Sequence, residues 1–442
     1  MPPIIFLAIA VALLIISIVR LNLHPFLALL LTGIFLGFAV GMPMEKVIES
    51  LLDGFASTLK WIGIVMILGT LIGEILNDTG GSIKISNTIL KIVGQKRVPL
   101  TMGLTGYVVS IPVFVDVAYI MLQSITELLS VKSKRNILVV GLSLTAGLTA
   151  THALMPPTPG PLAAAGLVSA NLGRVILINF FVAFCAATGG LIWATLYCKK
   201  IDLPYDQYLR DKFEKKQFKL DESYKPGIVG SFAPIFFPLI LIAAGSFAKT
   251  DTNNIFGKVF QFLGTPTVAL LFGVFIASFL LKANDRMKKL QETLDRSIQK
   301  AAIVIMITGA GGAFGGVIKA SNIGPSVANA ISSFGIPGII FPFLLAAALT
   351  TSTGSLTVSM VTSSSIIAPM LDSLNISPEM TVALIGSGSF CVFHTNSSFF
   401  WLLSRLHQIP PNTLFRTFTL QSLYMGLCGF LGILLLWIIG VH

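Results

Sequence analysis

Ionisable and hydroxyl side chains interrupt the apolar runs of this chain at four places: SIPVFVD (110–116), HALMPPTPGP (152–161), TTSTGS (350–355) and HTNSSFFW (394–401). Asp116, His152 and His394 are the titratable residues of these segments. An ionisable group inside a membrane is costly and points to function, and histidine exchanges protons near neutral pH. The chemistry that these residue types suit is the carrying of a proton or the binding of an ion or anion.

The candidate binding residues are small polar residues, glycine and histidine in or directly beside the last three of these places. We expect substrate to contact Thr151, His152, Thr353, Gly354, Ser355, His394, Thr395, Asn396 and Ser397. The candidate proton-coupling residues are Asp116, His152 and His394. Each set also has a structural interpretation, because small polar residues join membrane helices and buried histidines bond free carbonyls. Glu74, in contrast, lies near the end of its apolar run, where it can reach water.

The composition requires a membrane around these residues. The chain has 442 residues, of which 54% are hydrophobic and 11% charged, and its mean hydropathy is +0.86. A run of ~20 apolar residues crosses a bilayer as a helix, and we expect about ten such helices in an all-α polytopic membrane protein. The expected spans are 4–19, 25–42, 58–77, 137–171, 175–198, 228–247, 259–281, 301–319, 380–404 and 419–440. The first is expected to be a mature span rather than a signal peptide.

Charge and cysteine content exclude several other classes. The net charge of +11 is typical of basic cytoplasmic loops in a membrane protein, so no nucleic-acid partner is predicted. The four cysteines lack metal-ligand spacing, and neither a metal nor an organic cofactor is expected. The chain shows no HExxH motif, no nucleophile elbow and no Walker motif, so we do not expect an enzyme or an ATP-driven pump.

Two apolar segments, 99–130 and 337–371, are interrupted at their midpoints, and each half of ~14–17 residues is too short to cross a bilayer. We predict re-entrant hairpins there. Helices 137–171 and 380–404 are predicted to be discontinuous, because prolines and polar residues break them in the middle. Non-helical backbone at that depth survives only where protein or a wet cavity surrounds it.

An internal repeat is the most informative pattern. GEILNDTGG (73–81) aligns with GVIKASNIG (316–324), and LSLTAGLTATH (142–152) aligns with LIGSGSFCVFH (384–394). Lys and Arg flank the first hairpin and acids flank the second, which gives the two copies opposite orientations: the first hairpin opens to the cytoplasm and the second to the outside. The predicted organisation is N-terminal helices 1–57, first inverted repeat 58–198, linker region 199–300, second inverted repeat 301–418 and C-terminal helix 419–442. An amphipathic surface helix is expected at 282–300.

Several motifs in order resemble the gluconate:proton symporter (gluconate permease) family of the ion-transporter superfamily. They are GFASTLKWIGIVMILGTLIGEILNDTGG (54–81), IPVFVDV (111–117), HALMPPTPGP (152–161), ITGAGGAFGGVIKASNIG (307–324) and GSLTV (354–358). The resemblance implies proton-coupled symport of a gluconate-like sugar acid, or of another small hydroxy- or amino-carboxylate, across the cell membrane. It also implies an elevator-type motion and a homodimer.

The chain departs from the family pattern at three positions. Thr158 stands where a second histidine is typical, Thr350 where an arginine is typical, and Ser397 where an aspartate is typical. The changes favour a smaller or less hydroxylated carboxylate, or a different coupling ion. The alternatives to proton symport are therefore sodium-coupled carboxylate transport and, in a different class, a membrane-embedded hydrolase or acyltransferase that uses a serine with His152 or His394. A channel is disfavoured by the two closed hairpins.

Overall fold

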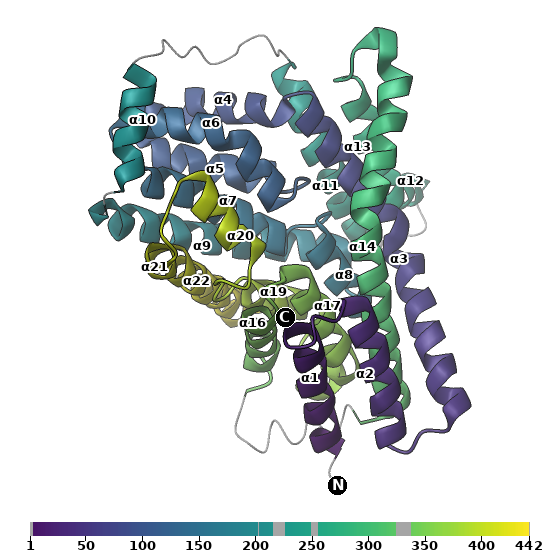
Figure 1. Cartoon of the computed structure of the whole chain (residues 1–442). Coiled ribbons are helices and arrows are strands. Elements are labelled where there is room, and N and C mark those ends of the chain that lie inside the picture. The colour runs from purple at the N-terminus through teal and green to yellow at the C-terminus, as the bar shows by residue number, and fades with distance from the viewer. Residues whose placement is uncertain (1–2, 202, 215–225, 249–254, 324–336, 442) are drawn as a thin grey trace.

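The computed structural model describes residues 3–201, 203–214, 226–248, 255–323 and 337–441, and within these ranges the regular elements are helices (Figure 1). Parts of the expected linker region, 202, 215–225 and 249–254, lie outside them. The helices of the first half are α1 (Pro3–Val19), α2 (Pro25–Ala39), α3 (Met44–Asp78), α4 (Gly81–Val93), α5 (Val98–Val109), α6 (Val115–Ser133), α7 (Ile137–Leu154), α8 (Pro159–Leu167), α9 (Leu172–Leu196) and α10 (Pro204–Glu214). Those of the second half are α11 (Ile228–Ala248), α12 (Ile255–Leu263), α13 (Pro266–Ser278), α14 (Arg286–Ala320), α16 (Ile340–Thr353), α17 (Leu356–Ile367), α18 (Leu371–Leu374), α19 (Pro378–Ser389), α20 (Ser398–Leu406), α21 (Pro411–Leu414) and α22 (Leu420–Ile438).

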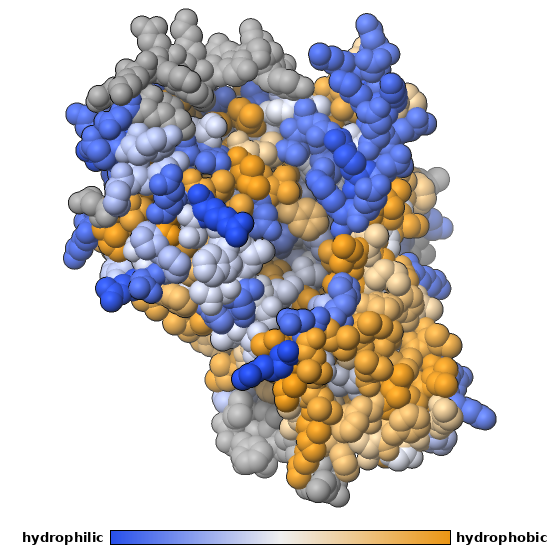
Figure 2. Space-filling model, in the orientation of Figure 1, coloured by the Kyte–Doolittle hydropathy of each residue, from blue (hydrophilic) through white to orange (hydrophobic). Residues whose placement is uncertain are grey.

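The outer surface of the helices is suited to lipid. In the described ranges, five helical segments are long and apolar enough to cross a membrane, and up to seven if each of two bent pairs counts as one span. Helix α2 buries Leu29 and Leu36 on one side and exposes Leu27, Leu31 and Phe38 on the other. A helix that is apolar all round needs an apolar solvent outside it. Figure 2 shows hydrophobic residues over α1, α2 and the lower part of α3, and hydrophilic residues over α10 and the upper part of α14.

Helices α3 and α14 form a long antiparallel pair along one side of the molecule (Figure 1). Each has 35 residues. Their backbones approach closely at Gly54 and Gly312: a Cβ built on Gly312 would lie 2.0 Å from Thr58 Oγ1 and 2.5 Å from the Gly54 carbonyl. Small residues permit this approach, as is common between membrane helices.

The bounds of these two helices correct the sequence interpretation. Helix α3 begins at Met44, well before the expected span 58–77, and α14 is continuous over both the expected surface helix 282–300 and the span 301–319. The polar segment 282–300 predicts a separate surface helix, but from Arg286 its residues continue into the span as one helix. The expected span 259–281 is two helices, α12 and α13, which are bent by 66° at Gly264 to Pro266. Proline there removes a backbone donor and restricts the residue before it.

Two helical pairs occupy the positions of the expected hairpins, and two more those of the expected discontinuous helices. Residues 110–114 join α5 to α6, and residues 354–355 join α16 to α17. Residues 155–158 separate α7 from α8, and residues 390–397 separate α19 from α20. In each half the hairpin packs directly on the broken helix: a Cβ on Gly147 would lie 2.0 Å from the Gly103 carbonyl, and one on Gly388 would lie 2.2 Å from the Phe343 carbonyl.

The contact between α3 and α14 generates a stability prediction. Gly312→Ala places a methyl group against Thr58 and forces the two helices apart, so we expect a loss of about 1–3 kcal/mol and a lower melting temperature in detergent. Gly63→Ala is the matched control, because a Cβ there meets nothing within 4 Å and alanine favours the helix. Equal melting temperatures for the two variants would contradict the close contact.

Candidate functional site

The tip of the second hairpin is held against the second broken helix by one backbone carbonyl. Thr351 O lies 2.8 Å from His394 Nε2 and accepts a hydrogen bond of 2.7 Å from Asn396 Nδ2. Because a carbonyl can only accept, the His394 ring carries its hydrogen on Nε2. One residue earlier, Thr350 donates to the Ser389 carbonyl over 2.8 Å. The hairpin and the break therefore form one unit.

Gly354 makes the closest approach within this unit. Its φ of +69° is left-handed, and a Cβ there would lie 2.2 Å from the Asn396 carbonyl. The neighbouring hydroxyls are partly engaged, because Thr353 donates to the Leu349 carbonyl over 2.7 Å and Ser355 Oγ accepts from Val358 N at 3.4 Å. Only glycine combines this backbone conformation with this contact.

The first hairpin tip meets the first broken helix in a corresponding way. The rings of Phe114 and His152 are 5.7 Å apart, and His152 Nδ1 is buried with no hydrogen-bond partner in the described residues. Asp116 lies in the first turn of α6, two residues after Phe114, and its side chain is exposed. A carboxylate in that position is favoured by the helix dipole. An acid and an imidazole thus flank the same tip.

Three helix N-termini converge between the two halves. Gly160, in the first turn of α8, packs on Leu356, the first residue of α17: a Cβ on Gly160 would lie 3.2 Å from Leu356 Cδ2. The contact of Gly354 with Asn396 brings the start of α20 to the same tip. Neither Thr158, before α8, nor Ser397, before α20, caps its helix with a side-chain hydrogen bond. At α8 the free donor is the Gly160 N–H, because Pro159 and Pro161 have none. Such free N–H groups and the positive dipole ends of the helices suit the carboxylate of a small anion.

The predicted binding residues differ in how available they are. Asn396 and Thr395 are exposed, and the Thr395 carbonyl accepts from Trp401 Nε1 at 2.8 Å. Thr151 is fully buried and donates to the Gly147 carbonyl over 3.0 Å, so its hydroxyl hydrogen faces its own helix. Ser397 is buried at the start of α20.

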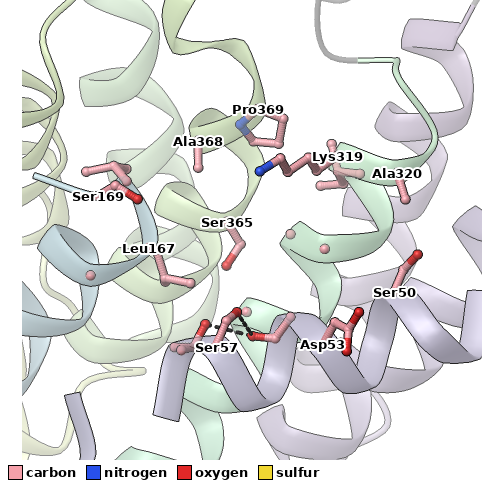
Figure 3. A pocket seen from close by; sticks show the side chains of 18 of the residues that line it. Ser50, Asp53, Ser57, Leu167, Ser169, Lys319, Ala320, Ser365, Ala368 and Pro369 are labelled. Atoms are coloured by element: carbon pink, nitrogen blue, oxygen red, sulfur yellow. Dashed lines mark hydrogen bonds between the residues drawn. The ribbon is translucent and has the colours of Figure 1, made fainter. Parts of the chain in front are cut away.

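A large cavity lies elsewhere. It has a volume of about 1260 Å³ and is bordered by α3, α14, the end of α8 and the end of α17 (Figure 3). None of the predicted site residues lines it.

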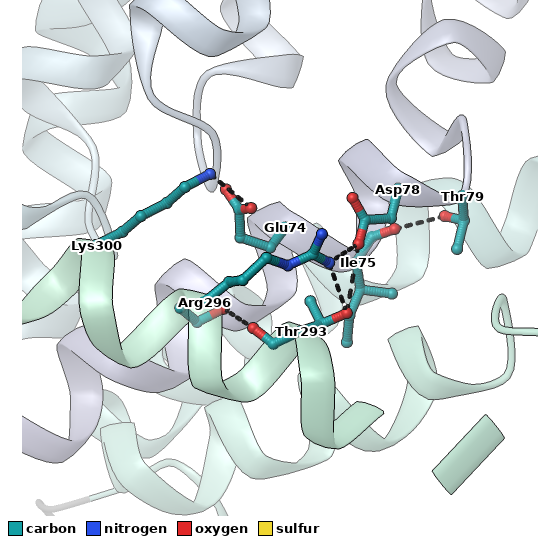
Figure 4. A network of polar contacts seen from close by, with 8 residues as sticks. Glu74, Ile75, Asp78, Thr79, Thr293, Arg296 and Lys300 are labelled. Carbon is teal, nitrogen blue, oxygen red and sulfur yellow. Dashed lines mark hydrogen bonds and ion pairs between the residues drawn. The ribbon is translucent and has the colours of Figure 1, made fainter. Parts of the chain in front are cut away.

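Sequence reasoning missed the charged contacts between α3 and α14 (Figure 4). Glu74 is 5% exposed and pairs with Lys300, with 2.7 Å between Oε2 and Nζ, instead of reaching water. Asp78 pairs with Arg296, and Thr293 donates to Asp78 over 3.3 Å. The spacing held a signal, since the acids are four residues apart on one helix and the bases four apart on the other, which places each pair on one helix face. The Thr351 carbonyl and Phe114 were also missed, because a backbone acceptor and an aromatic ring leave no specific pattern.

An apolar helical protein in which hairpin tips, broken helices and helix N-termini converge has the construction of a membrane transport protein. Residues 2–439 match the family described as GntP family permease, and the chain belongs to that family. It is a permease, not an enzyme, and a multi-pass protein of the cell membrane.

Several known proteins are similar over almost the whole chain. A gluconate permease of Pseudomonas aeruginosa is 32% identical, covering 96% of this chain and 95% of that protein. The high-affinity gluconate transporter of Escherichia coli K12 is 30% identical (98% and 99%), and the Gnt-II system L-idonate transporter of the same organism is 29% identical (98% of each). In fold, the chain resembles the Alcanivorax borkumensis YdaH transporter, with a TM-score of 0.68, 16% identity and coverage of 94% and 99%. Neisseria gonorrhoeae MtrF also gives a TM-score of 0.68, at 14% identity and 97% coverage of each chain.

The second hairpin tip generates a prediction at Gly354. Gly354→Ala adds a Cβ that clashes with the Asn396 carbonyl, so we expect the tip to separate from the break and transport to be lost. Gly41→Ala is the matched control: its φ of +82° is similar, but nothing lies within 4 Å of the added Cβ. Transport by purified protein in liposomes measures both, and full activity of Gly354→Ala would contradict the contact.

The pair of Glu74 and Lys300 generates a prediction about stability. Lys300→Met leaves a buried carboxylate without its cation, which lowers the free energy of unfolding by up to about 3 kcal/mol. The loss is smaller than this limit because solvent already screens the half-exposed lysine. We expect a clear fall in melting temperature, and recovery when Glu74→Gln is added. Arg296→Met should cost less, because its partner Asp78 is 31% exposed against 6% for Glu74. A larger fall in melting temperature for Arg296→Met than for Lys300→Met would show that the buried pair does not contribute more to stability.

Proposed function

We propose that this chain is a proton-coupled symporter that imports a sugar acid or a closely related small hydroxycarboxylate. The convergence of the N-termini of α8, α17 and α20 beside the second hairpin tip is the observation that carries the proposal. The relatives named for gluconate and L-idonate support the substrate class. In this account the carboxylate binds the free N–H groups, while Asn396, Thr353 and Ser355 contact its hydroxyls.

The proposed architecture is a pair of inverted repeats with re-entrant hairpins and about ten spans. The order of elements supports the repeat. Helix α3, the α5–α6 hairpin, the broken α7–α8 and α9 recur as α14, the α16–α17 hairpin, the broken α19–α20 and α22. Met44 and Arg286, which begin α3 and α14, lie 242 positions apart, as do His152 and His394. The opposite charge of the hairpin flanks supports their opposite orientation.

An elevator-type motion is proposed from the nature of the contacts between two groups of helices. Helices α3 and α14 are joined by glycine contacts and ion pairs, which suits a fixed scaffold. The hairpins and broken helices meet this scaffold at glycines: Gly69 and Gly73 face Pro157 and Pro112, and Gly311 faces Val361. A surface of glycines has low relief, so the hairpin unit can slide along it with little steric resistance.

Proton coupling is assigned to Asp116 and His152, with His394 as a further carrier. Asp116 is exposed, and the unpaired His152 Nδ1 can accept a proton. Protonation changes the relative energies of the states that the loaded carrier can adopt, which is how a gradient drives accumulation. Carbonyls and hydroxyls at the tips also suit Na⁺, so sodium coupling is the second candidate.

The departures from the family pattern fall on the site. Thr158 and Ser397 precede α8 and α20, where neutral residues leave the helix N-termini free of added charge. Thr350 donates its hydroxyl hydrogen to the Ser389 carbonyl. A site without these charged groups favours an acid with a single carboxylate. A homodimer, proposed from the family resemblance, is tested by measuring particle mass in detergent.

Uptake into proteoliposomes tests the function. The panel is gluconate, glycerate, lactate and D-serine, with a pH gradient and a sodium gradient imposed separately. We expect accumulation of at least one hydroxy acid with the pH gradient alone. Accumulation that requires the sodium gradient would show that sodium, not the proton, is the coupling ion. If folded protein accumulates none of these acids under either gradient, the proposed function is rejected.

Asp116→Asn is expected to abolish uptake driven by a pH gradient without changing the melting temperature, because an amide cannot take up the coupled proton and the exposed side chain supports no packing. Asp295→Asn, an exposed acid on the polar part of α14, is the control and should transport normally. Normal proton-driven uptake by Asp116→Asn would remove this residue from the mechanism.

A further inference from the structure

The large cavity lies between the two groups of helices that the proposed motion separates. Asp53 and Ser57 line it from α3 and Lys319 from α14, which form the scaffold, while Ser365 lines it from α17 and Ser169 from the end of α8 (Figure 3). Its remaining polar wall includes Asp372 on α18. By the predicted orientation, the ends of α8, α14 and α17 face the outside.

Lys319 is the single cation among the described residues that line the cavity. It lies in the last turn of α14, is exposed, and makes no ion pair within the described ranges. Figure 3 shows its side chain directed into the space between α14 and α17. An unpaired ammonium group can donate a charge-assisted hydrogen bond to the carboxylate of a small anion, although Asp53 and Asp372 make the described lining net negative.

The other polar groups of the wall are mainly acceptors. Ser50 donates its hydroxyl hydrogen to the Lys46 carbonyl over 2.6 Å, Ser57 to Gly54 over 3.2 Å, and Ser365 to Val361 over 2.7 Å. Their oxygens therefore face the cavity as acceptors. The carboxylates of Asp53 and Asp372 only accept as well.

One cation among mainly accepting groups, with the Asn322 amide as a further donor, is complementary to a polyhydroxylated monocarboxylate. Such a molecule offers one carboxylate to the cation and several hydroxyl hydrogens to the acceptors. A simple carboxylate without several hydroxyls would leave the acceptors of the wall without hydrogen bonds, and the acidic side chains of the wall would repel it. A cavity of about 1260 Å³ holds a six-carbon sugar acid with its water.

We propose that this cavity is an outer capture site for a polyhydroxylated monocarboxylate, in which Lys319 binds the carboxylate and Asp53 accepts from its hydroxyls. The inference rests on the proposed function for its substrate class. It adds a second site, distinct from the one at the hairpin tips. Capture there raises the substrate concentration near the tips, so it changes KM and leaves kcat nearly unaffected.

Kinetics with matched variants test the capture site. Lys319→Gln should raise the KM for gluconate uptake about tenfold with kcat within about twofold, since a charge-assisted hydrogen bond is lost, and Lys319→Arg should restore most of it. Asp53→Asn should raise the KM for gluconate more than that for lactate. The control is Lys46→Gln, an exposed lysine near the start of α3 that does not line the cavity.

A labelling experiment separates this inference from the proposed function, because it needs no transport. Lys319→Cys is labelled from outside with an impermeant thiol reagent, with the unmodified protein as blank, since none of its four cysteines lines the cavity. Gluconate should slow the labelling and lactate should not.

Protection without accumulation by the unmodified protein would keep the capture site and reject the symporter. Normal uptake with no protection and an unchanged KM for Lys319→Gln would overturn the capture site and leave the symporter intact. If Lys319→Gln and Lys46→Gln raise KM equally, the effect is general surface charge and the capture site is likewise rejected.

Discussion

Backbone groups that leave a helix inside a membrane must find partners within the protein, and the arrangement of this chain depends on how it meets that requirement at Thr351. The carbonyl of Thr351 receives both His394 and Asn396, so the hairpin tip and the interrupted helix stabilise each other. Without the break, neither side chain would reach the tip. Without the tip, the break would expose unpaired groups to hydrocarbon, which costs several kcal/mol for each group.

This constraint explains why the polar residues of the chain's interior are concentrated at so few places. The hairpin contributes a left-handed glycine, Gly354, and the broken helices contribute N-termini that lack side-chain caps. Groups left free by local structure become available to an anion. Glu74 and Lys300 join α3 to α14 near one end of the pair, and the hairpins and broken helices pack against the pair at glycines. Ion pairing and close packing are thus assigned to different parts of the same two helices.

Much of the fold was predictable from the sequence, because prolines, glycines and polar residues inside apolar runs mark interruptions directly. The helices α5 to α8 and α16 to α20 begin and end within a few residues of the bounds that these interruptions predict. The starts of α3 and α14 were placed wrongly, since a polar helical stretch looks the same whether it continues a span or lies apart from it. The site residues were named by type, but their partners were not, because the bond of His394 to Thr351 joins residues 43 positions apart through a backbone atom. The pairing of Glu74 with Lys300 spans 226 positions and was equally invisible.

The most direct test of the account is a structure of the protein in lipid nanodiscs with a transported acid bound. We predict density for the acid beside Gly354, with its carboxylate at the N-termini of α8, α17 and α20. Density that lies away from both hairpin tips at saturating acid, with the tips unchanged, would contradict the assignment of the site to the joined hairpin and broken helix.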